Sequence, residues 1–194
     1  MTKGRLEAFS DGVLAIIITI MVLEMKVPHG AELATLQPLI PVFLSYILSF
    51  IYLGIYWNNH HHMLQASRKV NGAILWANMH LLFWLSLVPF VTGWMGENSF
   101  ARWPMFLYGC VLLGAAIAYY ILSRLLVSHH GHESELAKAF GPDFKGQISI
   151  VFYVCGIGGS FLHPYVSAGF YILVAAIWLV PDRRIERTVA SSGE

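Results

Sequence analysis

The fold is decided by the stretch Arg5-Leu-Glu-Ala-Phe-Ser-Asp-Gly-Val-Leu-Ala-Ile-Ile-Ile-Thr-Ile-Met-Val-Leu-Glu24. Its second half is apolar enough to lie in lipid, whereas Arg5 and Asp11 place charges at its head. Charged groups near or within a membrane segment are costly to bury and therefore indicate a functional site. We interpret this stretch as a functional helix first and as a membrane anchor second.

A helical wheel of about 100° per residue separates two faces of this predicted helix. The first face is a continuous stripe within roughly 60° of Ile16, and it holds Arg5, Phe9, Ile16, Thr19, Ile20 and Leu23. Ser10 and Asp11 lie roughly 120° and 140° from Ile16, so we expect them to point at neighbouring helices. The pattern alone is more typical of an ordinary packing face or a lipid-facing one than of a functional surface.

The composition is that of a membrane protein. Hydrophobic residues make up 57% of the 194 residues, charged residues make up 12%, and the mean hydropathy is +0.61. Such values are unusual for a soluble domain. The formal net charge is only +1, and the basic residues do not gather with aromatic ones. We therefore expect no nucleic acid among the partners.

Six apolar runs predict an all-α integral membrane bundle of six transmembrane helices in a single domain, 1–194. They cover residues 7–25, 39–57, 73–91, 105–122, 147–162 and 166–180. The polar stretch 58–62 is expected to close the second run, and a solvated loop with a short helix near 133–140 is expected to follow the fourth. No stretch repeats the first helix, so we expect one repeat per chain.

The basic residues indicate the orientation of the six spans. Ten fall on one side of the predicted membrane and two, Lys26 and Arg102, fall on the other. The ten are Lys3, Arg5, Arg68, Lys69, Arg124, Lys138, Lys145, Arg183, Arg184 and Arg187. Because basic residues concentrate in cytoplasmic loops, both termini are expected in the cytoplasm.

Four short motifs resemble those of the transmembrane protein 175 family of potassium-permeable channels. They are Arg5-x-x-x-Phe9-Ser10-Asp11, Trp57-x-x-His60-His61, Leu75-Trp-x-Asn78 and Pro89-Phe90-x-Thr92. The resemblance extends over the first half of the chain motif by motif and over the second half by its spans. Prokaryotic members of this family have one six-helix repeat and assemble as homotetramers. The resemblance therefore implies a prokaryotic multi-pass protein of the plasma membrane.

The resemblance also implies site residues. In this family the first helix lines the pore, and bulky aliphatic side chains form its narrowest point. By motif position Ile16 corresponds to the constriction, and Thr19 and Leu23 line the wider part toward the outside. The wheel adds Ile20 to this stripe. A hydrophobic ring strips water from an ion and can gate by dewetting. No Thr-Val-Gly-Tyr-Gly sequence is present, so we expect no re-entrant selectivity-filter loop.

The motif residues outside the stripe are expected to form a polar network at the cytoplasmic ends of the first three helices. Its members are Arg5, Phe9, Ser10, Asp11, His60 and Asn78. The position of Arg5 stays open, because the wheel assigns it to the stripe and the motif to the network. Potassium is expected only as the permeant ion, with no cofactor and no resident metal.

Other classes of membrane protein are compatible with the composition. An enzyme with a metal centre would need repeated, spaced histidine boxes, which are absent, and the adjacent His60, His61 and His62 diverge by about 100° each on a helix. His129, His130 and His132 are expected in a solvated loop.

A proton- or cation-coupled membrane transporter is the alternative function, with Asp11 and His80 as proton relays, although paired broken helices and inverted repeats are not evident. Composition does not exclude a purely structural protein.

Overall fold

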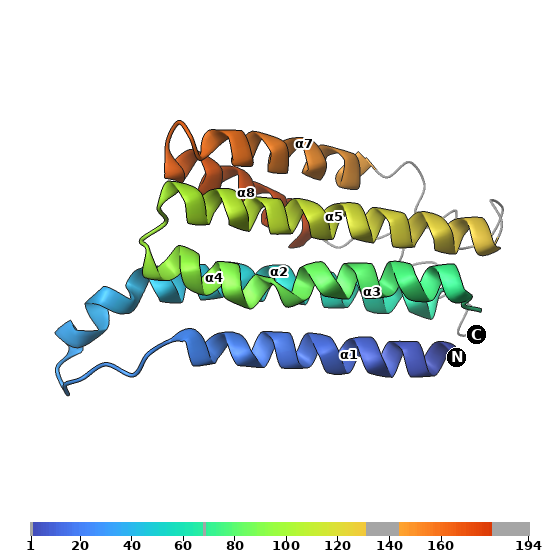
Figure 1. The fold of residues 1–194 in the computed structure, drawn as a ribbon, viewed down its shortest axis with the longest axis horizontal. Coiled ribbons are helices and arrows are strands. Elements are labelled where there is room, and N and C mark those ends of the chain that lie inside the picture. Colours follow the sequence, from blue (N-terminus) through green and yellow to red (C-terminus); the bar gives the residue numbers. More distant parts are fainter. Residues whose placement is uncertain (1, 68, 131–143, 180–194) are drawn as a thin grey trace.

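The chain is described by a computed structural model over residues 2–67, 69–130 and 144–179, and this part is helical without strands. The helices lie side by side with nearly parallel axes (Figure 1). They are α1 (Lys3–Ile20), α2 (Ile40–Gln65), α3 (Gly72–Ser86), α4 (Val88–Glu97), α5 (Arg102–His130), α7 (Phe144–Gly159) and α8 (Pro164–Leu179), with 3-10 segments η1 (Met21–Glu24) and η2 (Leu33–Leu39).

Four segments within the described residues are long and apolar enough to cross a membrane. They are Lys3–Glu24, Leu33–Gln65, Gly72–Glu97 and Arg102–His129. Helices α7 and α8 are apolar but shorter, with 16 residues each. When α3 and α4 are counted together, the described helices form six segments, which is the number of runs in the sequence. The prediction of an all-α membrane protein is confirmed.

Helices α2, α4 and α5 continue past the ends expected from the sequence, and α4 reaches Glu97 where the third run was expected to end at residue 91. Helix α2 extends through the histidine triplet to Gln65, because no glycine or proline interrupts residues 55–65. Helix α5 extends to His130, so residues 128–130 are helical, where a loop was expected. The expected short helix at 133–140, His132, and the expected end of the last helix at 181–184 lie outside the described residues.

The third apolar run differs from the single helix that the sequence predicts. Helix α3 ends at Ser86, and α4 begins at Val88. Pro89 falls in the first turn of α4, where its missing backbone N–H leaves no helical hydrogen bond unmade. The run is therefore one apolar segment made of two helices.

Close packing against α5 joins the halves of the bundle. Gly114 of α5 leaves the space that the Trp84 indole of α3 fills, and Gly109 leaves room for the Tyr171 ring of α8. Small residues allow helices to approach closely in lipid, where packing replaces the hydrophobic effect as the main attraction. This packing fixes α3 and α8 relative to α5.

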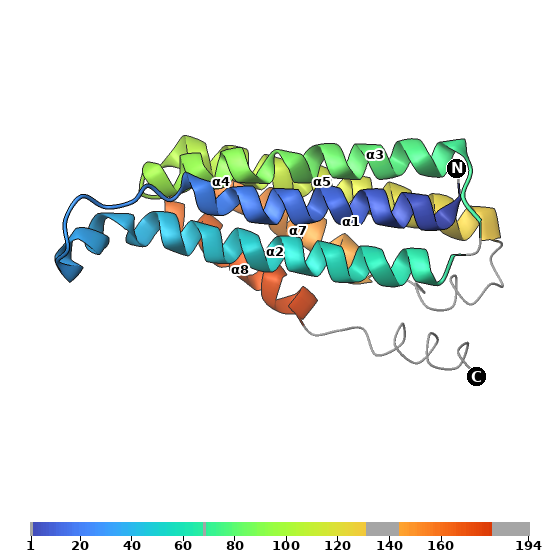
Figure 2. The ribbon, with the colours of Figure 1, turned by 90° about the horizontal axis from the view of Figure 1, so that it is seen from below.

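Helix α1 lies on one surface of the bundle, between α2 and α3 (Figure 2). Its buried apolar side chains, Leu6, Leu14 and Ile17, follow one side of the helix, and Met21 of η1 is buried as well. The opposite side has no neighbour among the described residues. An 18-residue apolar helix therefore presents a full face outside the packed core.

Replacement of Gly114 by alanine should destabilise the protein. The added Cβ would overlap the Trp84 indole, and such overpacking typically costs about 1–3 kcal/mol. Gly158→Ala is the matched control, because a Cβ at Gly158 meets nothing within 4 Å. Thermal unfolding of the detergent-solubilised variants measures the difference. Equal midpoints for the two variants would contradict the packing argument.

Candidate functional site

The exposed face of α1, continued by Leu23 of η1, contains the aliphatic stripe of the sequence. Ile16 is 60% exposed and Leu23 is 77% exposed, whereas Leu14 and Ile17 on the other side are 1% and 3% exposed. Ile20 is also exposed. The stripe therefore has no covering within one chain, and it is available to lipid, to water or to another subunit.

Thr19 adds one polar group to this face. It is exposed, and its Oγ1 donates to the carbonyl oxygen of Ala15 at 2.8 Å, with that of Ile16 at 3.0 Å. A hydroxyl has one hydrogen and two acceptor lone pairs. Because the helix backbone takes the hydrogen, the Thr19 oxygen keeps lone pairs that can face a cation.

Arg5 and Phe9 lie on the exposed face of α1 as well. Among the described contacts, no hydrogen bond or ion pair joins Arg5 to Ser10, Asp11 or the other polar motif residues. The geometry therefore follows the wheel for Arg5 and separates it from the buried polar groups. Phe9 likewise contributes exposed apolar surface.

A buried hydrogen-bond chain joins α1, α3 and α2. Asn78 Nδ2 donates to Ser10 Oγ at 2.9 Å, and Ser10 Oγ donates to the carbonyl oxygen of Leu6 at 2.9 Å. His60 Nε2 lies 2.7 Å from Asn78 Oδ1. Because an amide oxygen only accepts, His60 donates from Nε2 in this arrangement. Ser10 and Asn78 are fully buried and His60 nearly so, so the chain satisfies polar groups that water does not reach.

Asp11 makes a separate contact to α2. Its Oδ1 accepts a hydrogen bond from Trp57 Nε1 at 3.0 Å, and the Trp57 ring stacks on His61 with centroids 6.0 Å apart. Consecutive residues of α1 thus bind different helices, since Ser10 contacts α3 and Asp11 contacts α2. Both point at neighbouring helices, as the wheel indicates.

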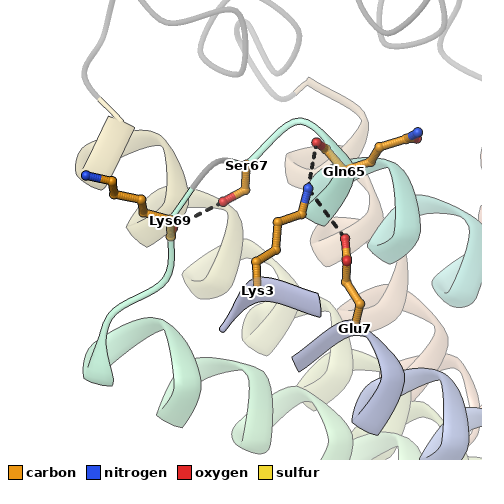
Figure 3. A network of polar contacts seen from close by, with 5 residues as sticks. All are labelled: Lys3, Glu7, Gln65, Ser67 and Lys69. Atoms are coloured by element: carbon orange, nitrogen blue, oxygen red, sulfur yellow. Dashed lines mark hydrogen bonds and ion pairs between the residues drawn. The ribbon is translucent and has the colours of Figure 1, made fainter. Parts of the chain in front are cut away.

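Further polar contacts, which the sequence reading missed, hold both ends of α1. Lys3 Nζ donates to the carbonyl oxygen of Gln65 at 3.0 Å and lies 3.6 Å from Glu7 Oε1 (Figure 3). Just after the other end, Lys26 pairs with Glu97 of α4 at 2.7 Å, and this hydrogen bond raises the pKa of Lys26. The spacing of Lys3 and Glu7 by four residues indicates their ion pair, whereas no sequence signal indicates the contact between Lys3 and Gln65.

His61, His62 and His80 take no part in the Ser10–Asn78–His60 hydrogen-bond chain. His80 is exposed and accepts a hydrogen bond from Trp84 Nε1 at 2.9 Å within its own helix. His61 is exposed and His62 is half-buried, so the triplet diverges around α2. Among the described residues, no group of three or more histidine, cysteine or acidic side chains is arranged to hold a metal ion.

Comparison with known proteins identifies the family. The family model described as the endosomal/lysosomal potassium channel TMEM175 matches residues 5–89. A potassium channel of Chryseobacterium sp. is 61% identical over 189 residues, which cover 97% of this chain and 98% of that protein. The chain belongs to the TMEM175 family. The matched residues contain the exposed stripe, the Ser10–Asn78–His60 chain and the Asp11–Trp57 contact.

A solved member of the TMEM175 family has the same fold. The crystal structure of a lysosomal potassium-selective channel TMEM175 homolog from Chamaesiphon minutus superposes with a TM-score of 0.80 and 28% identity over 93% of this chain and 97% of that chain. The human endosomal/lysosomal proton channel TMEM175 is 33% identical over 116 residues, which are 54% of this chain and 23% of that protein. These relatives are ion channels and not enzymes.

Asn78→Ala should destabilise the protein, because it removes a partner from both buried neighbours, Ser10 and His60. Leaving a buried polar group unsatisfied costs about 1–3 kcal/mol. Asn98→Ala serves as the control, since Asn98 makes one exposed hydrogen bond to the Trp94 carbonyl. Unfolding midpoints in detergent compare the two. An Asn78 variant as stable as the Asn98 variant would refute the role of the chain.

Proposed function

We propose that this protein is a potassium-permeable cation channel whose pore runs along the exposed face of α1 from each subunit. The observation that supports it most directly is that face itself, where Ile16 is 60% exposed and Leu23 is 77% exposed in a single chain. Membership of the TMEM175 family and the names of the bacterial relatives, which are called potassium channels, agree with this function.

The proposed assembly is a homotetramer in the bilayer, with the four α1 helices around a common axis. We take one chain, 1–194, as a single domain; its described residues form one set of six helical segments, so a closed pore along α1 requires several copies. Four copies cover the Ile16–Leu23 face by placing it around the axis instead of in lipid. Closed rotational symmetry of this kind is the usual form of a homo-oligomer.

The ion path follows from the order of side chains along α1. Four Ile16 side chains form the constriction, where an ion sheds much of its water. Potassium is the permeant species because it holds its water less tightly than sodium. The Thr19 oxygens face the ion one turn farther along, and Ile20 and Leu23 line the wider outer part. Selectivity arises at side chains, without a re-entrant backbone-carbonyl filter.

The proposed orientation has both termini in the cytoplasm of a prokaryotic cell, with the protein in the plasma membrane. The ten-to-two division of basic residues supports it. Helix α1 then begins inside, and α2 ends and α3 begins inside. His60, Asn78 and Ser10 lie near that cytoplasmic end, where they orient α1 below the constriction.

A proton- or cation-coupled transporter is the alternative that the sequence allows. Such a relay would need Asp11 and His80 to communicate, but Asp11 accepts from Trp57 of α2, and His80 accepts from Trp84 of α3. No described contact joins the two pairs. Planar-bilayer recording discriminates the functions, because a channel gives single-channel steps and a potassium reversal potential, whereas a coupled transporter gives saturable flux without steps.

Ile16→Asn should increase single-channel conductance and reduce selectivity for potassium over sodium. A polar ring retains water, which lowers the dehydration barrier at the constriction. Bilayer recordings under bi-ionic potassium and sodium measure both quantities, and the reversal potential should move toward zero.

Ile172→Asn is the matched control, since Ile172 is a 56% exposed isoleucine on α8, away from the proposed pore. It should leave conductance and selectivity unchanged. If Ile16→Asn behaves like this control, the pore does not follow the α1 stripe.

Asp11→Ala should reduce assembly before it changes selectivity. A hydrogen bond to a charged group contributes about 1.5–3 kcal/mol, and its loss frees α1 to rotate against α2. Trp57→Phe, which removes the indole N–H together with part of the ring, should also reduce assembly, because it removes the same hydrogen bond. Size-exclusion chromatography with light scattering reports the tetramer fraction, and a normal tetramer yield for Asp11→Ala would reject this role.

A further inference from the structure

A groove of about 300 Å³ lies between α2 and α8, remote from the exposed face of α1. Phe50, Gly54 and Asn58 line it from α2 at intervals of four residues, and Trp178 and Leu179 line it from α8. Figure 2 shows that α8 ends partway along α2, so the last turn of α8 forms one wall. A Cβ at Gly54 would meet nothing within 4 Å, so this glycine leaves a notch between its larger neighbours.

The polarity of the groove changes along its length. Phe50 and Gly54 offer apolar surface toward the middle of the bundle. One turn farther, the amides of Asn58 and Asn59 line the groove; Asn58 is exposed, and Asn59 Nδ2 donates to the carbonyl oxygen of Ile55 at 2.8 Å. The Asn59 bond uses a donor of its amide and leaves its oxygen available as an acceptor. A groove that is apolar along its length and polar at one end is complementary to an amphiphilic molecule.

Cationic side chains lie at the same end of the bundle. A cavity of about 40 Å³ shares Ile55, Asn59 and Trp178 with the groove, and Tyr120 of α5 lines its other side. One turn beyond, the exposed Arg124 guanidinium lies 5.0 Å from the Tyr120 ring centroid. Among the described residues Arg124 forms no ion pair. Lys145 precedes Gly146, which also lines the cavity.

We propose that the groove and the adjoining cavity bind one anionic phospholipid. An acyl chain lies along Phe50 and Gly54, the ester groups meet the asparagine amides, and the phosphate meets Arg124. Guanidinium groups bind phosphate through charge-assisted hydrogen bonds, and basic pockets at the ends of membrane helices recognise anionic lipid headgroups. The order of apolar, amide and cationic groups matches that of a phospholipid from tail to headgroup.

This inference does not depend on the ion path, because it uses only membrane insertion and residues of α2, α5, α7 and α8. Full-length protein is delipidated in detergent and titrated with phosphatidylglycerol or phosphatidylcholine. Native mass spectrometry then counts the lipids bound per subunit, and thermal unfolding reports stabilisation. We expect phosphatidylglycerol to bind preferentially and to raise the unfolding midpoint.

Two variants and two matched controls test the site. Arg124→Gln should weaken phosphatidylglycerol binding about fivefold, the contribution of one cation near an anionic headgroup, and Gly54→Leu should abolish it by filling the notch. Arg102→Gln removes another α5 arginine that lies over a ring, Phe161, at the opposite end of the bundle. Gly169→Leu enlarges an exposed glycine of α8 with equally open surroundings. Both controls should bind phosphatidylglycerol like the unmodified chain.

Several results would overturn the proposal. Equal binding of the two lipids would mean nonspecific detergent-like adsorption, and an equal loss in Arg102→Gln and Arg124→Gln would mean a general charge effect. The same stabilisation by inorganic phosphate would mean that Arg124 binds a free anion and not a lipid headgroup. A change of oligomeric state in Gly54→Leu with unchanged lipid binding would assign the groove to a second copy of the chain.

Discussion

The hydrogen bonds of Ser10 and Asp11 fix the rotation of α1 about its own axis. Consecutive residues on a helix diverge by about 100°, so a bond from Ser10 to Asn78 of α3 and one from Asp11 to Trp57 of α2 leave α1 little freedom to turn. Once that rotation is set, Leu14 and Ile17 face the core and Ile16 faces outward. The exposed stripe thus depends on two polar contacts a turn or more away.

The rest of the bundle supplies a rigid support for these contacts. Helix α3 is held against α5 where Trp84 fills the space over Gly114, and α2 is joined to α4 and α5 by the Ser49 hydroxyl, which lies 2.6 Å from Thr92 Oγ1 and 3.0 Å from the Tyr108 hydroxyl. Lys3 and the Lys26–Glu97 pair secure the two ends of α1. Contacts with α5 therefore help to position the first half of the chain, and α8 supplies one wall of the α2–α8 groove.

Much of the candidate site follows from local periodicity. The wheel separates Ile16, Thr19 and Leu23 from Ser10 and Asp11 because side-chain direction on a helix depends only on residue spacing. The partner of each side chain does not follow from residue spacing. The wheel and the motif give Arg5 different positions, and neither identifies the Trp57 indole as the donor to Asp11. Helix ends were also less predictable, since the break at Leu87 and the continuation of α2 to Gln65 depend on packing as well as on composition.

The sequence by itself determined the helical class, the apolar segments, the family and the two faces of α1. Only the tertiary structure decided which neighbour each polar side chain meets, that Arg5 stays outside the buried chain, and that α2 and α8 enclose a groove with Arg124 nearby. The physical reason is that periodicity and hydropathy are properties of one helix. Contacts between helices depend on the stagger and rotation of both partners, which packing of the whole bundle sets.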